Sequence, residues 1–427
     1  MPEYVSLQEV EPMKVVYAVN TTLRRIDERL VNHGERVAFI ASTICKYGKF
    51  DLDIKTLFML SFFHDIGAYK RINLDELLIF DVDNVEEHCI YGYLFMKHLT
   101  PLSKSAEAIL YHHSSWENIK GKNLTYGEYA AMIHLADRMD VLFGAGKSNR
   151  QILGTLDEYK KIFKEDHLAA AEGCLMENIL NADIVKSDFH NRNLEICKHF
   201  NPSALRTLEY LKMIVYSIDF RSDHTVTHSI NTVAISINIA RHFNLSQKEI
   251  DDIYIGSLLH DIGKVAIDLS ILESPGRLSD DEMCIMRTHV EETGYIIKGV
   301  IPDEIYEISM SHHEKLDGSG YPRGLKGNDL TLSQRIVAVS DIVSALCSRR
   351  SYKEPFPKEK TLAIISAMSG TQLDSDVCNY VVNCYDSIMD ETDVSRTKII
   401  EKYQHIMNEY ERLVKIVRNM KNDNKAG

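Results

Sequence analysis

Residues 258–266 read LLHDIGKVA, and residues 62–70 read FFHDIGAYK. The two stretches share the tetrapeptide His-Asp-Ile-Gly, and histidines and aspartates recur in the same order around both of them. Self-similarity of this kind indicates an internal repeat, so we expect two copies of one structural unit in the chain. The first copy contains His33, His64, Asp65, His88, His112, His113 and Asp137, and the second contains His228, His260, Asp261, His289, His312, His313 and Asp341.

Apolar residues recur at helical spacing over most of the chain, while the alternation that is typical of strands is nearly absent. Two capping boxes support helices, because Ser246 is followed by Glu249 and Ser279 by Glu282. Each box places a hydroxyl at a helix start and a carboxylate three residues further on. We therefore predict an all-α fold. The clearest helical patterns lie at 226–243, 250–259, 330–346 and 399–417.

The domain organisation follows from the repeat, because no Pro-rich or low-complexity linker marks a boundary. A chain of 427 residues is long enough for at least two separately packed cores. The helix at about 395–420 is amphipathic, so it either joins two chains in a homodimer or packs back on the body. We expect a first domain over 1–165, a helical linker over 166–204, a second domain over 205–400, and a C-terminal helix and tail over 401–427.

Charge and composition exclude several classes of function. The net charge of −13 argues against a binder of nucleic-acid polymers, because phosphate backbones are held by clustered Lys and Arg. No segment approaches the roughly 18 consecutive apolar residues of a membrane span, and the N-terminus does not resemble a secretory signal. We expect a cytoplasmic protein without a membrane partner. The cysteines are expected to be reduced core thiols: Cys45, Cys89, Cys174, Cys197, Cys284, Cys347, Cys378 and Cys384.

The repeated set of five histidines and two aspartates predicts a metal site in each copy. Neutral imidazole and carboxylate together suit divalent iron, manganese or zinc, and no thiolate belongs to the set. Neighbouring ligands such as His260 and Asp261 diverge by about 100° on a helix, so each pair can face two adjacent metals. A bridging Asp261 would then hold a dinuclear centre. Two metals about 3.5–4 Å apart activate a shared water and hold phosphate oxygens, which predicts phosphodiester hydrolysis.

At these residues the chain resembles the HD superfamily of metal-dependent phosphohydrolases, and its second copy resembles the HD-GYP subfamily. The subfamily is indicated by the string HDIGK at 260–264 and by HHEKLDGSGYPRGLKGNDLTLSQRIVAVSD at 312–341. The resemblance implies two tandem HD-type metal-binding helical bundles, the second of which is a cyclic dinucleotide phosphodiesterase. Iron and manganese are the favoured metals, and zinc is a further candidate.

The resemblance also implies roles for single residues of the second copy, carried over by position. Asp261 and Lys264 would act at the scissile phosphate. Ser344 departs from the pattern, since the family usually has an aspartate there. One metal would be held by His228, His260, Asp261 and Asp341, and the other by Asp261, His289, His312 and His313. The implied substrate contacts are Lys315, Gly320, Tyr321, Pro322, Arg323 and Arg350.

The first copy keeps all seven ligand positions but lacks the signature loop. Between His113 and Asp137 it reads SSWENIKGKNLTYGEYAAMIHLA, and Ala68 stands where Lys264 stands in the second copy. We expect one or two further metals in this copy. Three interpretations stay open for it: an active phosphohydrolase with another substrate such as the linear dinucleotide, a metal-bound sensor, or a scaffold.

The sequence thus predicts an enzyme that hydrolyses cyclic di-GMP to linear pGpG, with GMP as an open alternative for the final product. A mixed cyclic GMP-AMP dinucleotide is the alternative substrate. A non-catalytic receptor for cyclic dinucleotides is the alternative function, and the intact set of ligands speaks against it. Metal identity, nucleobase preference and oligomeric state are not fixed by the sequence.

Overall fold

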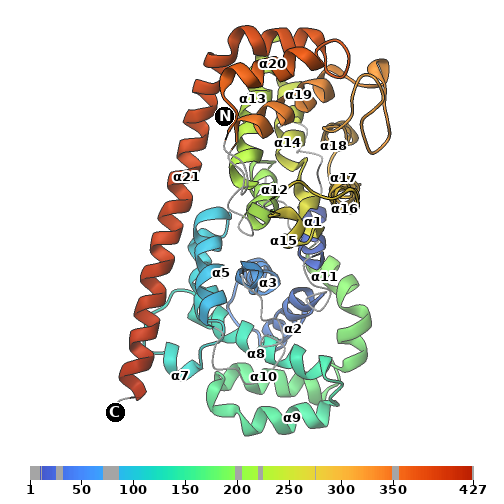
Figure 1. Cartoon of the computed structure of the whole chain (residues 1–427). Coiled ribbons are helices and arrows are strands. Elements are labelled where there is room, and N and C mark those ends of the chain that lie inside the picture. Colours follow the sequence, from blue (N-terminus) through green and yellow to red (C-terminus); the bar gives the residue numbers. More distant parts are fainter. Residues whose placement is uncertain are drawn as a thin grey trace. The chain divides into compact units, whose positions relative to one another are not determined.

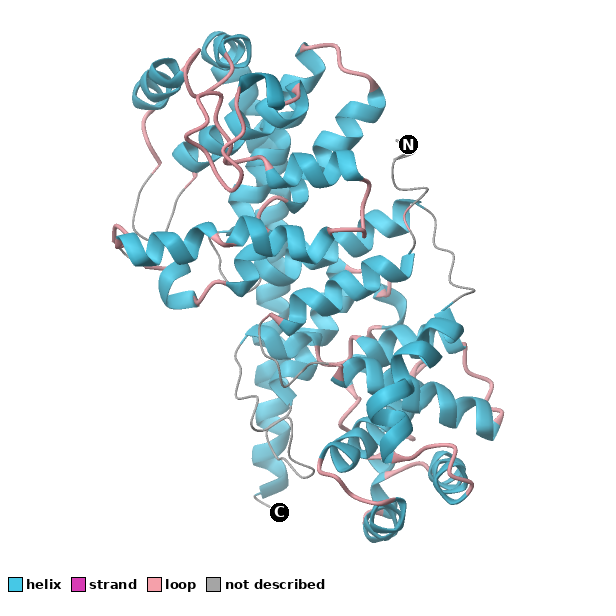
Figure 2. Cartoon of the chain, turned by 90° about the vertical axis from the view of Figure 1, so that its right-hand side faces the viewer, coloured by secondary structure: helices cyan, strands magenta, loops and turns pink. Residues whose placement is uncertain are grey.

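The computed structural model describes residues 10, 12–25, 32–70, 86–197, 204–219, 225–274, 276–348 and 355–425. Over these residues the chain is helical, with two isolated β-bridges and no strand (Figure 2). The predicted all-α fold class is confirmed. None of the helices in this part of the chain combines the length and the apolar character that crossing a bilayer requires.

Contacts divide the chain into two compact units (Figure 1). The N-terminal unit consists of Asp27–Asn201 with His405–Gly427, and the C-terminal unit consists of Met1–Ile26 with Pro202–Gln404. Each unit therefore includes a helix from the opposite end of the sequence. This grouping differs from the expected domains at both chain ends, and the boundaries expected from the sequence stay predictions.

The N-terminal unit is built around α2, α3 and α8, which contact one another. Phe58 of α3, Ile40 of α2 and Phe143 of α8 are among its largest fully buried side chains. The elements of this unit are α2 (His33–Gly48), α3 (Ile54–Phe62), η3 (Ile66–Lys70), α5 (Glu86–Leu99), η4 (Ser103–Ser105), α6 (Glu107–Leu110), α7 (Trp116–Ile119), α8 (Gly127–Gly144), α9 (Asn149–Glu158), η5 (Lys160–Ile162), α10 (Glu165–Met176), η6 (Ile184–Asp188) and α11 (Phe189–Cys197).

The C-terminal unit has α13 at its centre, where it contacts both α14 and α19 (Figure 1). Ile235 and Ile239 lie one helical turn apart on α13 and pack with Val339 and Val343, which have the same spacing on α19. The elements are α1 (Pro12–Arg24), α12 (Ala204–Asp219), α13 (Thr225–His242), α14 (Gln247–Leu259), η7 (Ile262–Ala266), α15 (Leu269–Leu272), α16 (Asp280–Arg287), α17 (His289–Ile297), α18 (Asp303–Met310), η8 (Gly327–Asp329), α19 (Leu332–Cys347), α20 (Lys358–Met368) and α21 (Ser375–Lys425), whose residues from His405 onward belong to the N-terminal unit.

Both predicted capping boxes are confirmed. Ser246 precedes α14, and its side chain accepts a hydrogen bond from the backbone of Glu249, whose carboxylate accepts one in return. Ser279 and Glu282 form the same pair of bonds at the start of α16. These caps satisfy backbone N–H groups that have no partner within the helix, so they fix where the two helices begin.

The helix at each end of the chain is held by polar contacts as well as by apolar packing. Arg25, which follows α1, pairs with Glu292 of α17 at 2.9 Å and lies over the ring of Tyr295. In the N-terminal unit, Glu409 of α21 lies 2.6 Å from Lys97 and 2.9 Å from His98 of α5. The C-terminal helix therefore packs back on the body, as one of the two alternatives predicted, whereas a homodimer stays a prediction.

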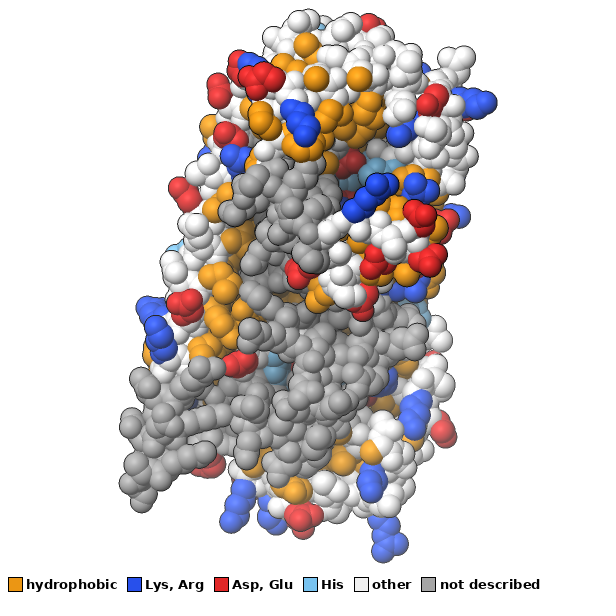
Figure 3. Space-filling model, viewed as in Figure 1, with side chains coloured by type: hydrophobic (Ala, Val, Ile, Leu, Met, Phe, Trp, Pro, Cys, Tyr) orange, Lys and Arg blue, Asp and Glu red, His pale blue; other side chains and the backbone are white. Residues whose placement is uncertain are grey.

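The described surface on the face drawn in Figure 3 carries charges of both signs. Lys and Arg side chains alternate there with Asp and Glu, and they form no continuous basic stripe among the side chains that can be seen. This distribution agrees with the net charge of −13.

Candidate metal centres

Helix ends position the predicted ligands of the C-terminal unit. His260 and Asp261 follow directly after α14, His289 is the first residue of α17, and His312 follows shortly after the end of α18. The last carbonyl groups of a helix have no partner within it. Nδ1 of each of these three histidines donates to the carbonyl oxygen of the residue three positions earlier, at 2.7 Å.

These hydrogen bonds decide which ring nitrogen can bind a metal. Because Nδ1 carries the proton that it donates, Nε2 is left as the free lone pair in each neutral ring. The N-terminal unit repeats the arrangement, with Nδ1 of His64 and His112 donating to backbone carbonyls at 2.7 and 2.6 Å. The local fold therefore presents these Nε2 atoms toward the carboxylate of Asp261 in one unit and of Asp65 in the other.

His228 needs a different partner, because it lies within α13, where helical carbonyls are already bonded. Its Nδ1 lies 2.9 Å from the hydroxyl of Ser344, which in turn donates to the carbonyl of His228. The resulting orientation places Nε2 of His228 3.0 Å from Oδ1 of Asp341. Ser344 thus takes the orienting place in which the family usually has an aspartate.

The two oxygens of Asp261 face two different groups of ligands. Oδ2 lies 3.4 Å from Nε2 of His228 and 3.2 Å from Nε2 of His260. Oδ1 lies 3.3 Å from Nε2 of His289 and 3.9 Å from Nε2 of His312. This is the arrangement that a carboxylate bridging two ions requires.

The second aspartate of the unit completes the set. Oδ1 of Asp341 lies 3.6 Å from Nε2 of His260, and its Oδ2 lies 3.5 Å from Nδ1 of His313. The structure therefore brings all seven predicted residues of the C-terminal unit together. Their role as metal ligands stays a prediction that rests on this geometry.

Buried polar atoms without partners indicate that the residues fit metal ions. Nε2 of His260 and Oδ1 of Asp261 are buried and have no hydrogen-bond partner, and the same holds for His64 and Asp65 of the N-terminal unit. A buried lone pair without a partner costs free energy, so most such atoms in proteins are paired. Nitrogen and oxygen donors that converge in this way suit borderline divalent metals.

The electrostatics of the C-terminal unit favour the ligand forms of these side chains. Burial opposes the charge of Asp261, but the neighbouring His260 and Lys264 outweigh it and hold the pKa of this carboxyl well below its usual range. Burial also lowers the pKa of His289 to about 3 and that of His313 to about 4, which keeps both rings neutral. Neutral imidazole and ionised carboxylate are the forms that bind metals.

His260 differs from these two rings. Burial lowers its pKa, but the carboxylates of Asp261 and Asp341 have the larger combined effect and raise the pKa to about 10. A metal ion that binds Nε2 of His260 must therefore displace a proton.

The glycine of His-Asp-Ile-Gly explains why this tetrapeptide recurs. A Cβ on Gly263 would collide with the backbone of His289 and Thr293, so only glycine allows η7 to pack against α17. Thr293 strengthens the contact, because its hydroxyl accepts from the Gly263 amide at 2.9 Å and donates to the His260 carbonyl at 3.0 Å. This packing brings Asp261 to His289.

Lys264 lies beside the carboxylate of Asp261. Its ammonium group forms an ion pair with Oδ2 of Asp261, and only 16% of its side chain is exposed. A largely buried cation at this point can attract an anionic substrate to a protein whose net charge is negative.

The signature loop is held against the predicted metal ligands by a buried carboxylate. Glu314 is 2% exposed and accepts hydrogen bonds from the backbone amides of Arg323 at 2.7 Å and Leu325 at 2.9 Å. Gly320 must be glycine, because a Cβ there would meet the backbone of Glu314. At the same point the ring of Tyr321 packs on that of His313, with 4.7 Å between the centroids.

The predicted substrate contacts have different surroundings in the structure. Lys315, Gly320, Tyr321 and Pro322 lie in the loop beside His313. The guanidinium group of Arg323 is engaged elsewhere, 2.7 Å from Glu307 and 3.0 Å from the hydroxyl of Ser311. Arg350 lies outside the described residues. Substrate contact by all six residues stays a prediction.

Arg287, which sequence reasoning missed, lies over the ring of Tyr321, 5.2 Å from the centroid. It is the last residue of α16 and stands two positions before His289. The only signal in the sequence is that closeness to His289, because the contact with Tyr321 joins residues 34 positions apart.

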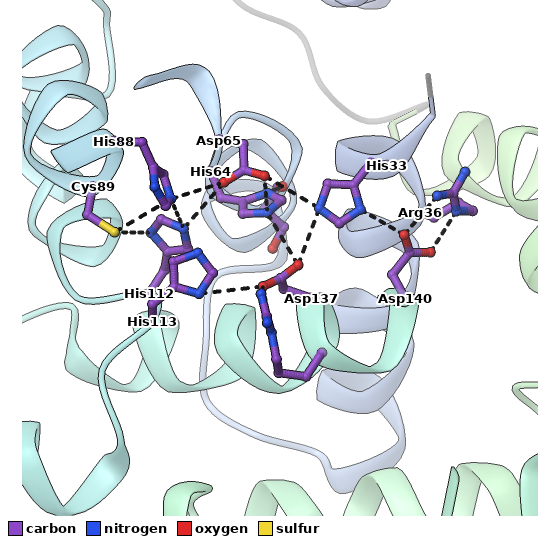
Figure 4. Close-up of polar contacts among 12 residues, drawn as sticks. His33, Arg36, His64, Asp65, His88, Cys89, His112, His113, Asp137 and Asp140 are labelled. Atoms are coloured by element: carbon purple, nitrogen blue, oxygen red, sulfur yellow. Dashed lines mark hydrogen bonds and ion pairs between the residues drawn. The ribbon is translucent and has the colours of Figure 1, made fainter. Parts of the chain in front are cut away.

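The N-terminal unit assembles its seven residues in the same way (Figure 4). Nε2 of His33 lies 3.3 Å from Oδ1 of Asp137 and 3.5 Å from Oδ2 of Asp65. On the other side of Asp65, Oδ1 lies 3.4 Å from Nε2 of His88 and 3.5 Å from Nε2 of His112. His64 contacts Oδ2 of Asp65 at 3.4 Å, and Nδ1 of His113 lies 3.6 Å from Oδ2 of Asp137.

The surroundings of the N-terminal ligands are different from those of the C-terminal unit. Asp140 replaces Ser344 and accepts from Nδ1 of His33 at 2.7 Å, while Arg36 binds both oxygens of Asp140 (Figure 4). Arg138, which is 5% exposed, donates to Oδ2 of Asp137 at 2.6 Å. This unit thus has a buried cation on α8, whereas the C-terminal unit has its cation on η7.

The chain matches known protein families in both halves. A family model described as HD domain matches residues 30–142, and another with the same description matches residues 212–377. The first matched segment contains the ligand set from His33 to Asp137, and the second contains the set from His228 to Asp341.

Curated proteins and solved structures are similar to the chain. It is 28% identical over 383 residues to the 3'3'-cGAMP-specific phosphodiesterase 1 of Vibrio cholerae, in an alignment that covers 82% of this chain and 86% of that protein. It is 32% identical over 225 residues to the cyclic di-GMP phosphodiesterase response regulator RpfG of Xanthomonas campestris, covering 52% of this chain and 59% of the relative.

The solved structure supports the fold. A crystal structure of cyclic GMP-AMP specific phosphodiesterases in V. cholerae, V-cGAP3, superimposes with a TM-score of 0.56 at 19% identity. The alignment covers 87% of this chain and 97% of the other.

Proposed function

This chain contains two HD domains and is homologous to HD-GYP proteins, and we propose that it is a metal-dependent phosphodiesterase that opens a cyclic dinucleotide in its C-terminal domain. The observation that carries the proposal is the position of Asp261, whose two carboxylate oxygens face separate pairs of histidines. The signature loop with Tyr321 borders the same ligands.

The seven predicted ligands and Lys264 of the C-terminal domain each have a part in this reaction. Two divalent ions would supply a bound hydroxide and would bind the phosphate oxygens. His228, His260 and Asp341 would hold one ion, His289, His312 and His313 the other, and Asp261 would join them. Lys264 places a positive charge beside Asp261, where it stabilises the charge that develops on the phosphate.

The loop binds the ligand in this proposal. Glu314 fixes the backbone of Arg323 and Leu325, so the loop is ordered before the substrate arrives. The ring of Tyr321 covers one side of His313 and excludes water there. Hydrolysis of one phosphodiester bond would open the ring to a linear dinucleotide, and hydrolysis of both would give mononucleotides.

Two substrates are proposed for this site. Cyclic di-GMP is the substrate predicted from the signature loop, and the similarity to the response regulator of X. campestris supports it. The mixed cyclic GMP-AMP dinucleotide is supported by a relative that spans both domains of this chain. A cyclic dinucleotide receptor without catalysis is the third candidate, and the complete ligand set argues against it.

The function of the N-terminal domain is proposed separately. Its seven ligand positions are assembled as closely as those of the C-terminal domain, which supports metal binding. Activity on a linear dinucleotide, a sensor role and a scaffold role stay alternatives for this domain. Iron or manganese as the metal of the C-terminal domain and a cytoplasmic location also stay predictions.

The test begins with anaerobic purification of the full chain and analysis of its metals. The protein is then incubated with cyclic di-GMP, 3'3'-cyclic GMP-AMP and cyclic di-AMP, and the products are separated by chromatography. We expect ring opening of a guanine-containing dinucleotide and none by an Asp261→Ala variant. Tight binding of the intact dinucleotide without any product, in a protein with its full complement of metal, would establish the receptor instead.

A further inference from the structure

We propose that Cys89 is a thiolate ligand of the metal held by His88, His112 and His113 in the N-terminal domain. The two domains would then differ in the chemistry of their metal sites, with a sulfur donor in the first and only nitrogen and oxygen donors in the second. This inference rests on proposed metal binding by the N-terminal domain and does not depend on hydrolysis of a dinucleotide.

The position of the sulfur atom carries the argument. Sγ of Cys89 lies 3.6 Å from Nε2 of His88, the ring nitrogen that faces Oδ1 of Asp65 (Figure 4). One donor atom from each of the four residues lies within 4.8 Å of all the others. With zinc–sulfur and zinc–nitrogen bonds of about 2.3 and 2.0 Å, two ligands of one tetrahedral ion are about 3.5 Å apart, close to the distance from Cys89 to His88.

Two further atoms point to an ion at this place. Oδ1 of Asp65, whose side chain is 10% exposed, faces His88 and His112 but has no hydrogen-bond partner. Nε2 of His113 is likewise buried without a partner. Lone pairs of this kind are explained when a cation lies between them.

The surroundings of Cys89 are unlike those of an ordinary core cysteine. Cys89 is 4% exposed, yet its neighbours include imidazole rings. Cys174 of the same domain shows the contrast, because burial raises the pKa of its thiol to about 12 and keeps it protonated. A thiol that binds a metal must instead be the thiolate.

The C-terminal domain provides an internal comparison. Val290 follows His289 as Cys89 follows His88, and it is fully buried. The two positions are alike in burial, so core packing alone would be satisfied by valine in both domains. The thiol is the feature that distinguishes the N-terminal position.

A thiolate ligand changes which metal ion a binding site prefers. Soft sulfur ligands favour zinc over the harder divalent ions, while sites of imidazole and carboxylate also accept iron and manganese. We therefore expect zinc in the N-terminal domain, whereas the ligands of the C-terminal domain also suit iron or manganese.

Cobalt substitution tests the sulfur ligand without measuring activity. Cobalt(II) bound by thiolate has an intense charge-transfer absorption in the near ultraviolet, which nitrogen and oxygen ligands do not produce. The full chain is stripped of metal, titrated with cobalt(II) and compared with Cys89→Val, which copies the residue of the C-terminal domain. Cys174→Val is the matched control.

The wild type and the control should both show the band, and Cys89→Val should lack it. Cys89→Val should also bind zinc at least ~tenfold more weakly, because removing even a residue that only hydrogen-bonds a metal ligand lowers metal affinity by that factor. A band that persists in Cys89→Val would overturn the proposal. So would cobalt bound to the wild type without the band.

A second measurement avoids dependence on the folding of Cys89→Val. The full chain with both His260→Ala and Asp261→Ala keeps an intact N-terminal ligand set, and X-ray absorption of its zinc form reports the ligand atoms directly. We expect one sulfur for each N-terminal domain, which is one for each zinc ion when the domain holds one ion and one for every two ions when it holds two. A coordination shell of nitrogen and oxygen alone would contradict the assignment, whatever the variant does to catalysis.

Discussion

The hydroxyl of Ser344 lies 2.9 Å from Nδ1 of His228, at the place where Asp140 lies 2.7 Å from Nδ1 of His33 in the N-terminal domain. Both partners fix the tautomer that leaves Nε2 free for a metal. The carboxylate makes its imidazole more basic than the hydroxyl does, so we expect the two domains to differ in how strongly this histidine binds a metal.

Replacement of Ser344 should change metal retention in the C-terminal domain. Ser344→Ala leaves Nδ1 of His228 without its acceptor, and we expect metal affinity to fall ~tenfold, as for other partners of ligating histidines. Ser344→Asp should raise it. Ser348→Ala is the control, because Ser348 is buried nearby but bonds Asn231 instead of a ligand. Equilibrium dialysis that finds equal affinity in Ser344→Ala and the control would contradict this role.

Arg287 should contribute to substrate binding, since its guanidinium group lies at Tyr321 beside the metal ligands. A charge-assisted contact of arginine with a phosphate or a base edge is worth about one to two powers of ten in affinity. We expect Arg287→Met to raise KM about tenfold with little change in kcat. Arg241→Met is the matched control, because Arg241 is exposed at the far end of α13, ~20 Å along the helix from His228. Equal KM values for the two variants would remove Arg287 from the site.

Glu314→Gln should loosen the signature loop. The amide side chain offers one acceptor where the carboxylate offers two, so one of the amides of Arg323 and Leu325 loses its bond at a cost of ~1–3 kcal/mol. Hydrogen exchange should become faster at 315–326. Asp329→Asn, at an exposed carboxylate of the same loop, should leave these rates near those of the wild type. Unchanged exchange in Glu314→Gln would show that other contacts hold the loop.

Glu409→Gln should release part of the C-terminal helix from α5. Glu409 pairs with both Lys97 and His98, and a partly exposed cluster of this kind contributes up to ~1 kcal/mol, or about a fivefold change in opening. Hydrogen exchange over 405–416 should rise accordingly. Asp386→Asn removes the exposed pair with Lys358 elsewhere on α21 and should not affect that segment. An increase in both variants would point to general fraying of the helix.

The sequence was sufficient for the fold class and for choosing the seven residues that the structure brings together in each unit. Helical periodicity and the capping serines are local features, so the sequence alone places Ser246 and Ser279 at helix starts. The order of histidines repeated in two halves revealed the sets, because chance rarely produces such a match. Where each donor atom points depends on how the helix ends pack together, and that packing joins segments far apart in the sequence.

Contacts between distant segments were not predictable in the same way. Asp140 reaches His33 across 107 positions, and α1 joins the C-terminal unit although it begins the chain. Cys89 was expected to be an ordinary core thiol, because neither spacing nor pattern distinguishes it from the other cysteines. Its closeness to His112 becomes visible only when α5 and α6 are packed together.

The central claim is that ring opening belongs to the C-terminal domain, and product chromatography with two double variants tests it most directly. The chain with His64→Ala and Asp65→Ala should still open the cyclic dinucleotide, since the seven ligands and the loop of the C-terminal domain are intact. The chain with His260→Ala and Asp261→Ala should give no linear product, since the bridging carboxylate is absent. If the His64/Asp65 variant loses ring opening as completely while the C-terminal domain keeps its metal, the two sites are not independent and the claim is wrong.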